Sequence, residues 1–318
     1  MKKRSKFFQA GFSLIEIMIA TGIGLFIAAG IATVYVSSKE TYALRDQISE
    51  MDESARVAMK ALRTHLERAG YSSNANPQLE NYLLPSSFSP SSVICPTGQA
   101  NIINVNRIAN SSDGQSIGTN ALTTNQIMAR ADTIGVSFLA DDQLLDDCTG
   151  SSWKNRCMID PEASISTSVS QTPNAQLMRR VYSSFRVQKN TSRQNSVGDG
   201  IPELVCGGSL NTYSQPWAQG IENMQLRYGI DNVPSTIPSG QKKQWQVDDY
   251  WTATQVTAND AWDKIALVQV ALLVRTMEPM FEQAESKVYQ LFDQNIVTND
   301  RYKRAVYTTT IYLRNVAR

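Results

Sequence analysis

The sequence is poor in the residues from which most enzymes build their catalytic sites. It has one histidine, His65, in 318 residues, and its four cysteines form no CxxC pair. Zinc sites need several histidine or cysteine ligands, and a Ser-His or Cys-His nucleophile would have to use His65. The sequence also has no glycine-rich phosphate loop, G-x-S-x-G elbow or HExxH motif. We therefore expect no enzymatic activity and no cofactor.

Basic charge is scarce beyond the first residues. The formal net charge is +1, and Lys2, Lys3, Arg4 and Lys6 all precede the first acidic residue, Glu16. No later basic run could hold a row of phosphates, so we expect no nucleic-acid partner.

Acidic residues gather in two short stretches, "ADDQLLDD" at 140–147 and "GDG" at 198–200. Neither has the D-x-D-x-D-G spacing of a calcium loop. We interpret both as solvated turns, with a calcium site near Asp141–Asp147 or Asp199 as the alternative.

The four cysteines are Cys95, Cys148, Cys157 and Cys206. An even number in a chain that enters a membrane at its start favours disulfides in an oxidising compartment. Four cysteines permit three connectivities. The short loop between Cys148 and Cys157 favours their pairing, which leaves Cys95 with Cys206 by elimination.

An apolar run at residues 12–36 is long enough to cross a membrane. Its roughly 25 residues span about 37 Å as a helix. A secretory signal has a shorter apolar core, of about 7–15 residues, and a small-residue cleavage site after it. Neither feature is present, so hydropathy alone favours an uncleaved signal anchor. The basic residues before the run place the N-terminus in the cytoplasm and the remaining chain outside it.

The apolar pattern continues beyond the span in helical register, at residues 37–70. No proline lies between Phe12 and Asn76, so one helix is predicted from about residue 12 to residue 69. His65 is expected on its surface, beside the polar face. The predicted apolar stripe consists of Leu44, Ile48, Met51, Ala55, Ala58, Leu62, Leu66 and Ala69.

The stretch "GFSLIEIMIA" at 11–20 resembles the processing signal of type IV prepilins and of type II secretion pseudopilins. The basic leader ends at Gly11, Phe12 follows, and Glu16 stands four residues later. The resemblance implies that a prepilin peptidase removes residues 1–11 and methylates the new amine of Phe12. It also implies that Glu16 pairs with the terminal amine of a neighbouring subunit during assembly. This offers a reason for a carboxylate in an apolar span, where it costs about 2.5–3.5 kcal/mol.

Four later segments resemble the PilW family of minor pilins and keep its order. They are "GDGIPELVCGG" at 198–208, "GIENMQLRYGID" at 220–231, "WDKIALVQVALLVRT" at 262–276 and "DRYKRAVYTTTIYLRN" at 300–315. Residues 71–180 carry no such resemblance.

Residues 71–318 are predicted to form a globular, β-rich periplasmic domain. The run at 264–276 is continuously apolar, as in a strand buried on both faces, whereas residues 305–313 alternate like a half-buried strand. The stretches "TIGVSFLA", "RRVYSSFRVQ" and "ENMQLRYGID" are further predicted strands. The predicted fold is α+β and pilin-like: a long N-terminal helix packed on an antiparallel sheet, with long loop insertions.

The resemblance implies a minor pilin that helps to prime type IV pilus assembly, located in the bacterial inner membrane and then at the pilus tip. Its implied partners are the prepilin peptidase, other minor pilins, the major pilin, the inner-membrane platform and a tip adhesin. A minor pseudopilin of a type II secretion system and a membrane-anchored periplasmic enzyme or binding module stay open as alternatives.

Overall fold

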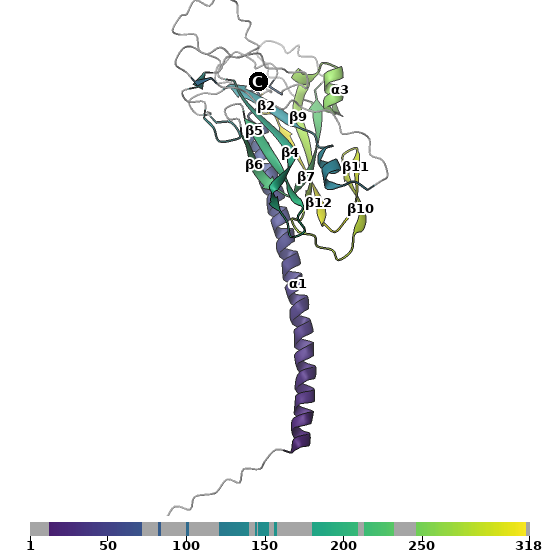
Figure 1. Cartoon of the computed structure of the whole chain (residues 1–318). Coiled ribbons are helices and arrows are strands. Elements are labelled where there is room, and N and C mark those ends of the chain that lie inside the picture. The colour runs from purple at the N-terminus through teal and green to yellow at the C-terminus, as the bar shows by residue number, and fades with distance from the viewer. Residues whose placement is uncertain are drawn as a thin grey trace, which may run out of the picture. The chain divides into compact units, whose positions relative to one another are not determined.

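The computed structural model of the chain describes residues 13–71, 82–83, 100–101, 121–139, 144, 146–152, 156–157, 180–208, 213–231 and 246–315. The chain divides into two compact units, Met1–Ser49 and Glu50–Arg318. Helix α1 (Leu14–Leu66) begins in the first unit and ends in the second, which also contains every strand (Figure 1).

The turn that follows α1 is held by Gly70 and by residues far away in the sequence. The last carbonyl groups of a helix lack partners within it and need other donors. The N–H groups of Arg68 and Ala69 donate to the carbonyls of His65 and Leu66, and in the turn that follows, Asn315 Nδ2 donates to the carbonyls of Glu67 (2.8 Å) and Ala69 (3.4 Å). Gly70 follows in the left-handed conformation (φ +72°), and its N–H donates to the Ser137 carbonyl at 2.9 Å. Asn315 and Ser137 therefore hold the turn that follows α1.

The predicted apolar stripe is buried from Met51 onward, whereas Leu44 is 43% exposed and Ile48 is half-buried. This side of the helix faces the main core of the unit, which also contains residues from both four-stranded sheets. The buried members of the stripe are Met51, Ala55, Ala58, Leu62, Leu66 and, just after the helix, Ala69.

The surface position expected for His65 is wrong. Its side chain is only 5% exposed and lies between the rings of Phe185 and Trp217, at centroid distances of 5.5 and 5.7 Å. The sheets cover a wider arc of the helix than the narrow stripe of i, i+3 and i+4 positions indicates. His65 therefore belongs to the core.

The first four-stranded sheet has the order β2-β4-β5-β6, with every neighbouring pair antiparallel. Its strands are β2 (Ile134–Leu139), β4 (Arg180–Gln194), β5 (Gly200–Gly208) and β6 (Ser214–Gln219). The chain leaves this sheet at Gly220 (φ +76°), where an added Cβ would lie 2.6 Å from the Arg275 carbonyl oxygen. This turn needs glycine, and it leads directly into the second sheet.

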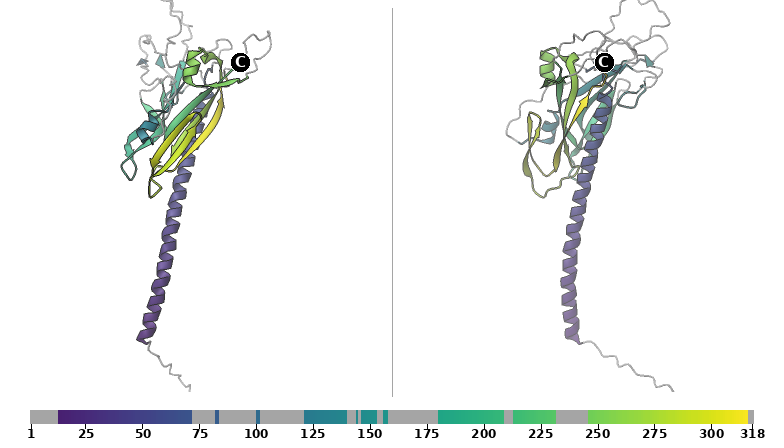
Figure 2. Two further views of the ribbon diagram at one scale, coloured as in Figure 1. Left: turned by 90° about the vertical axis from the view of Figure 1, so that its right-hand side faces the viewer. Right: turned by 180° about the vertical axis from the view of Figure 1, so that it is seen from behind.

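The second four-stranded sheet has the order β12-β9-β7-β8 and is also antiparallel (Figure 2). Its strands are β7 (Ile221–Ile230), β8 (Asp249–Trp251), β9 (Ile265–Arg275) and β12 (Arg304–Tyr312). Strand β9 is buried on both faces, as predicted. One face packs into the main core, and Ala271 and Leu273 on the other face pack against Leu291 and Ile296 of a separate hairpin.

The remaining elements are short. The hairpin consists of β10 (Glu285–Leu291) and β11 (Gln294–Asp300), and helix α2 (Thr124–Met128) contributes Ile127 to the same small core. Strands β1 (Ala100–Asn101) and β3 (Arg156–Cys157) pair in parallel. Helix α3 (Ala253–Ala258) and the 3-10 turn η1 (Trp262–Lys264) precede β9.

The predicted α+β class is confirmed: a long N-terminal helix and antiparallel sheets are present, and each predicted strand is found. The fold differs in having two four-stranded sheets around the helix stripe instead of one. The division of the chain at residues 11, 36 and 70 stays a prediction.

Candidate functional site

The first turn of α1 holds Glu16 in a reciprocal pair of hydrogen bonds with Ser13. The Ser13 N–H donates to Glu16 Oε2 at 3.1 Å, and the Glu16 N–H donates to Ser13 Oγ at 3.3 Å. This is a capping box, in which the serine and the glutamate each satisfy a backbone donor of the helix start. A carboxylate here also faces the positive end of the helix dipole. Gly11 and Phe12 lie outside the described residues, so cleavage and methylation there stay predictions.

The apolar side chains that follow Glu16 are exposed on every side of the helix in the unit Met1–Ser49. Leu25, Phe26 and Tyr35 are 72%, 82% and 68% exposed. The helix is long and apolar enough to cross a membrane, and its most apolar window contains no buried residue. A surface of this kind is suited to contact with lipid or with other helices.

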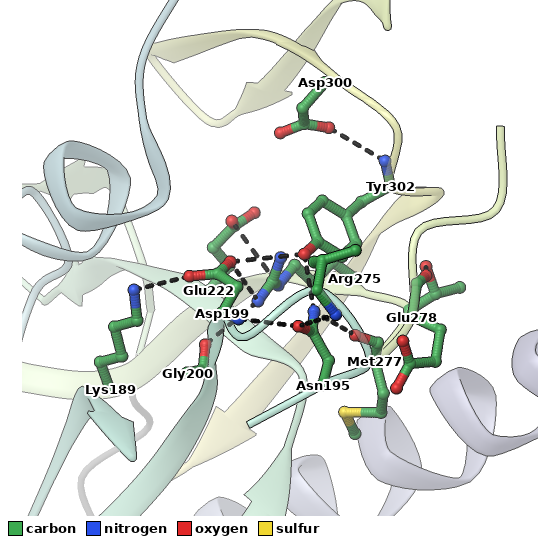
Figure 3. A network of polar contacts seen from close by, with 12 residues as sticks. Lys189, Asn195, Asp199, Gly200, Glu222, Arg275, Met277, Glu278, Asp300 and Tyr302 are labelled. Atoms are coloured by element: carbon green, nitrogen blue, oxygen red, sulfur yellow. Dashed lines mark hydrogen bonds and ion pairs between the residues drawn. The ribbon is translucent and has the colours of Figure 1, made fainter. Parts of the chain in front are cut away.

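A buried network of charged side chains lies between the two sheets (Figure 3). Arg304 and Glu222 are 3% and 0% exposed, and they form a two-point ion pair: Arg304 Nε lies 2.6 Å from Glu222 Oε2, and Nη2 lies 3.1 Å from Oε1. Asp300 binds the other side of the same guanidinium at 2.6 and 2.7 Å. Burial disfavours the charged form of Arg304, but the charges and hydrogen bonds of the two carboxylates outweigh it and raise its pKa.

Arg275 forms the second half of this network and is fully buried. Its guanidinium stacks on the Tyr302 ring at 3.9 Å, and its Nη2 lies 3.3 Å from Asp199 Oδ2 and from the Gly200 carbonyl. Among the described residues, Arg275 Nη1 has no hydrogen-bond partner. Stacking on an aromatic face is a contact suited to such a planar cation. Arg275 thereby joins β9 of the second sheet to the start of β5 in the first.

The turn between β4 and β5 is held against the second sheet by Asn195. Its Nδ2 donates to Tyr302 Oη at 2.7 Å and to the Met277 carbonyl at 3.1 Å, while its Oδ1 accepts from the Asp199 N–H at 2.8 Å. Nearby, Glu278 accepts hydrogen bonds from the backbone N–H and the hydroxyl of Ser196. The network therefore links the two sheets through polar contacts, and its role is structural. We call this set of residues the buried clamp.

Asp199, a candidate calcium ligand, belongs to this clamp. Its Oδ1 lies 2.7 Å from Lys189 Nζ, and its Oδ2 faces Arg275. Burial opposes ionisation of Asp199, but the hydrogen bonds and charges of Lys189 and Arg275 are stronger and lower its pKa. Two cations already balance this carboxylate, which leaves it little attraction for a third.

The other acidic stretch also holds a structural carboxylate. Asp147 is buried, and its Oδ1 accepts from the Thr149 N–H (2.9 Å), the Thr149 hydroxyl (2.6 Å) and the Ser151 N–H (3.3 Å). Asp147 therefore orders its own turn and is not the solvated residue expected. Asp141 and Asp142 lie outside the described residues. Within the described stretches, no group of three His, Cys, Asp or Glu side chains could hold a metal ion.

The disulfide pairing predicted from the sequence is wrong, because Cys148 bonds to Cys206 and not to Cys157. The Cα atoms are 6.0 Å apart across a sequence separation of 58. Both half-cystines are buried beside β4 and β6: the Cys148 N–H donates to Ser183 Oγ, and its carbonyl accepts from Trp217 Nε1, each at 3.1 Å. Sequence proximity favoured Cys157, whereas the sheet brings β5 to the turn of Cys148. Cys95 lies outside the described residues.

Comparison with known proteins identifies the second half of the chain. The family model of PilW, described as type IV pilus-assembly protein W, matches residues 164–315. Residues 164–315 are therefore similar in sequence to this family. The match confirms the resemblance stated from the sequence, and it covers all four PilW-like segments. The processing signal at residues 11–20 lies outside the match.

A solved structure and the curated proteins complete the comparison. The type IV-like pilin TTHA1219 from Thermus thermophilus is 12% identical, with a TM-score of 0.32, over 86% of this chain and 97% of that one. No curated protein sequence matches the chain.

The four PilW-like segments meet in the buried clamp. Each segment supplies at least one of its charged members: Asp199 from the first, Glu222 from the second, Arg275 from the third, and Asp300 and Arg304 from the fourth. Sequence reasoning missed this site because each residue, taken alone, looks like a solvated surface charge. A charged residue in or beside each otherwise apolar strand is the sequence signal that could have indicated a buried polar site.

Proposed function

We propose that the protein is a minor pilin that takes part in priming type IV pilus assembly, in a complex with other minor pilins at the pilus tip. The observation that carries this proposal is the PilW match over residues 164–315. An apolar helix long enough to span a membrane, with a carboxylate in its first turn, supports it. Its partners are then the prepilin peptidase, the major pilin, the inner-membrane platform and a tip adhesin.

In this proposal the chain begins as a single-pass inner-membrane protein with its N-terminus in the cytoplasm and its body in the periplasm. The peptidase cuts between Gly11 and Phe12 and methylates the amine of Phe12. Glu16 then exchanges its bond to the Ser13 N–H for the terminal amine of a neighbouring subunit. Pairing two charges that would otherwise be isolated in lipid favours the assembled state.

The experiment is an intact mass of the protein from its host's membranes, with sequencing of the N-terminal peptide. We expect a chain that starts at methylated Phe12 and is also present in sheared pili. A chain that starts at Met1, or one cut after residue 36, would overturn the proposal in favour of a membrane-anchored enzyme or binding module. Correct processing combined with absence from pili would point to a secretion pseudopilin.

Substitution of Glu16 separates its charge from its capping role. Glu16→Gln retains the capping box, because glutamine also serves at this position, but it removes the charge. We expect Glu16→Gln to be inserted and cleaved normally, yet to be lost from sheared pili by about tenfold or more, an effect on the order of one charge-assisted pair. Incorporation of Glu16→Gln at the wild-type level would show that charge pairing is not needed.

A further inference from the structure

Strand β12 is an edge strand that lacks the usual protection against pairing with another chain. It pairs with β9 in unbroken register from Arg304 to Tyr312, and it ends the sheet on that side (Figure 2). Between Ala305 and Tyr312 its sequence, AVYTTTIY, contains no charge, proline or glycine. Natural proteins usually blunt an exposed edge with charges, proline, bulges or short strands.

The other three edges of the two sheets carry such protection. Strand β6 contains Pro216 and shows a register shift against β5, and β8 is only three residues long. The edge of β2 is partly covered, because the Ser137 N–H donates to the Tyr82 carbonyl at 2.7 Å and Val136 bridges to Leu83. Among the described residues, β12 is therefore the open edge of the two four-stranded sheets.

The register with β9 identifies which backbone groups of β12 face outward. The Leu313 N–H donates to the Ala266 carbonyl at 3.0 Å, and the Thr276 N–H donates to the Lys303 carbonyl at 2.9 Å. Odd-numbered residues of β12 therefore bond to β9, and the N–H and C=O groups of even-numbered residues point away from it. Among the described residues, nothing bonds to the backbone of Val306, Thr308 or Thr310 on that outer side.

The side chains of β12 show that this edge is rigidly presented. Tyr307 hydrogen-bonds to Asp52, and Thr309 Oγ1 accepts from Arg63 Nη2 at 3.1 Å, so the odd-numbered face is fixed against α1. On the even-numbered face, Val306 packs on the small core under the hairpin, while Tyr312 is 65% exposed. A preorganised strand of this kind needs little ordering when a second strand binds.

We propose that β12 receives an extended strand from another pilus protein, which adds to the sheet by backbone hydrogen bonding. The donor is an uncharged segment rich in β-branched or aromatic residues, because the edge from Ala305 to Tyr312 offers no charge to match. The source of the donor rests on the proposed function, whereas the edge itself does not.

The test uses the full chain in its host, with the photo-cross-linker p-benzoylphenylalanine placed at Thr308 or at Thr310. Adducts from membranes and from sheared pili are digested and mapped by mass spectrometry. Strand addition requires the two positions to cross-link to residues two apart on one segment of a different pilus protein. A probe placed at Tyr250 on strand β8, which is 38% exposed, is the control and should not reach that segment.

A proline variant tests the backbone bonding directly. Thr310→Pro removes one outward N–H without touching the bonds to β9, and its ring obstructs an incoming strand. We expect it to lower the adduct from position 308 by about tenfold or more, whereas Thr310→Val leaves the adduct unchanged. Formation of the Cys148–Cys206 bond reports that each variant has folded. If the proline variant misfolds, Thr310→Lys provides the same comparison through a charge on the edge.

Three results of the cross-linking itself would overturn the proposal. These are no adduct from either position, adducts scattered over several segments, and adducts that join β12 to β12 of a second copy. An adduct with unchanged yield in the folded Thr310→Pro and Thr310→Lys variants would overturn it as well. The N-terminal mass measured in the same samples tests the minor-pilin proposal separately, so the two failures can be told apart.

Discussion

At the scale of single residues, the buried imidazole of His65 links the stability of the folded domain to pH. Burial, and secondarily the charge of Arg68, lowers the pKa of His65 from 6.5 to about 3. The unfolded chain therefore takes up a proton near pH 6.5 that the folded chain refuses until about pH 3. Stability is lost as the pH falls through this window, by about 2 kcal/mol at pH 5.

A His65→Leu variant removes this pH dependence. We expect its free energy of unfolding, measured with urea in detergent, to change little between pH 7.5 and pH 5, while the wild type loses about 2 kcal/mol. Asp199 and Asp300 also have lowered pKa values, but carboxylates of this kind lose their contribution only below about pH 4. Equal slopes for both proteins above pH 5 would contradict the assignment to His65.

The buried ion pair of Arg304 and Glu222 should be costly to break. Removing one partner leaves the other charge buried and unpaired, so we expect Arg304→Gln to lose about 3–5 kcal/mol in urea unfolding. Arg56→Gln is the matched control, because Arg56 pairs with Glu53 at 2.9 Å on the surface, with side chains 74% and 60% exposed. The control should cost less than about 1 kcal/mol. Similar losses in the two variants would show that burial does not set the value of the pair.

At the scale of elements, the Cys148–Cys206 bond fixes a turn onto β5. Gly208 at the end of this strand leaves no room for a Cβ against the Asp147 carboxylate, so the turn and the strand pack directly. Non-reducing peptide mapping should find Cys148 linked to Cys206. Closing a loop of this length stabilises a fold by about 4 kcal/mol in the chain-entropy model, and Cys148→Ala with Cys206→Ala should lose about that much. A Cys148–Cys157 peptide would refute the structure at this point.

Elements with a strong period could be predicted from the sequence, whereas contacts across the fold could not. The apolar run at 265–275 predicts a strand buried on both faces, and the apolar stripe from Met51 to Leu66 predicts a helix packed on a sheet. Both are found in the structure. Nothing in the sequence around Cys148 reveals that β5 passes beside it. Likewise, Glu222 and Arg304 are separated by 82 residues, and only the register of β7, β9 and β12 brings them together.

At the scale of the whole molecule, the second half of α1 belongs to the core of the unit Glu50–Arg318. A chain of residues 50–318 retains Met51, Ala55, Ala58, Leu62 and Leu66, whereas a chain of residues 70–318 loses all five. Losing this many buried side chains costs more than the 5–15 kcal/mol by which native proteins are usually stable.

We therefore expect residues 50–318 to melt cooperatively and to resist proteolysis, and residues 70–318 to do neither. Circular dichroism melting and limited trypsin digestion would measure the difference. Equal protease resistance of the two chains would contradict the placement of the helix in the core.

The hydrogen bonds from Asn315 to the turn after α1 set the earliest time at which the domain can finish folding. Ribosomes add residues at roughly 5–20 per second, so the carbonyl of Glu67 is made about 10–50 seconds before the side chain that satisfies it, 248 residues later. Strands β9 and β12, which contribute to the same core as Leu62 and Leu66, also come from the last quarter of the chain. During that interval the apolar stripe of the helix lacks these strands, and we expect a holding chaperone or the membrane surface to shield it until Asn315 has been made.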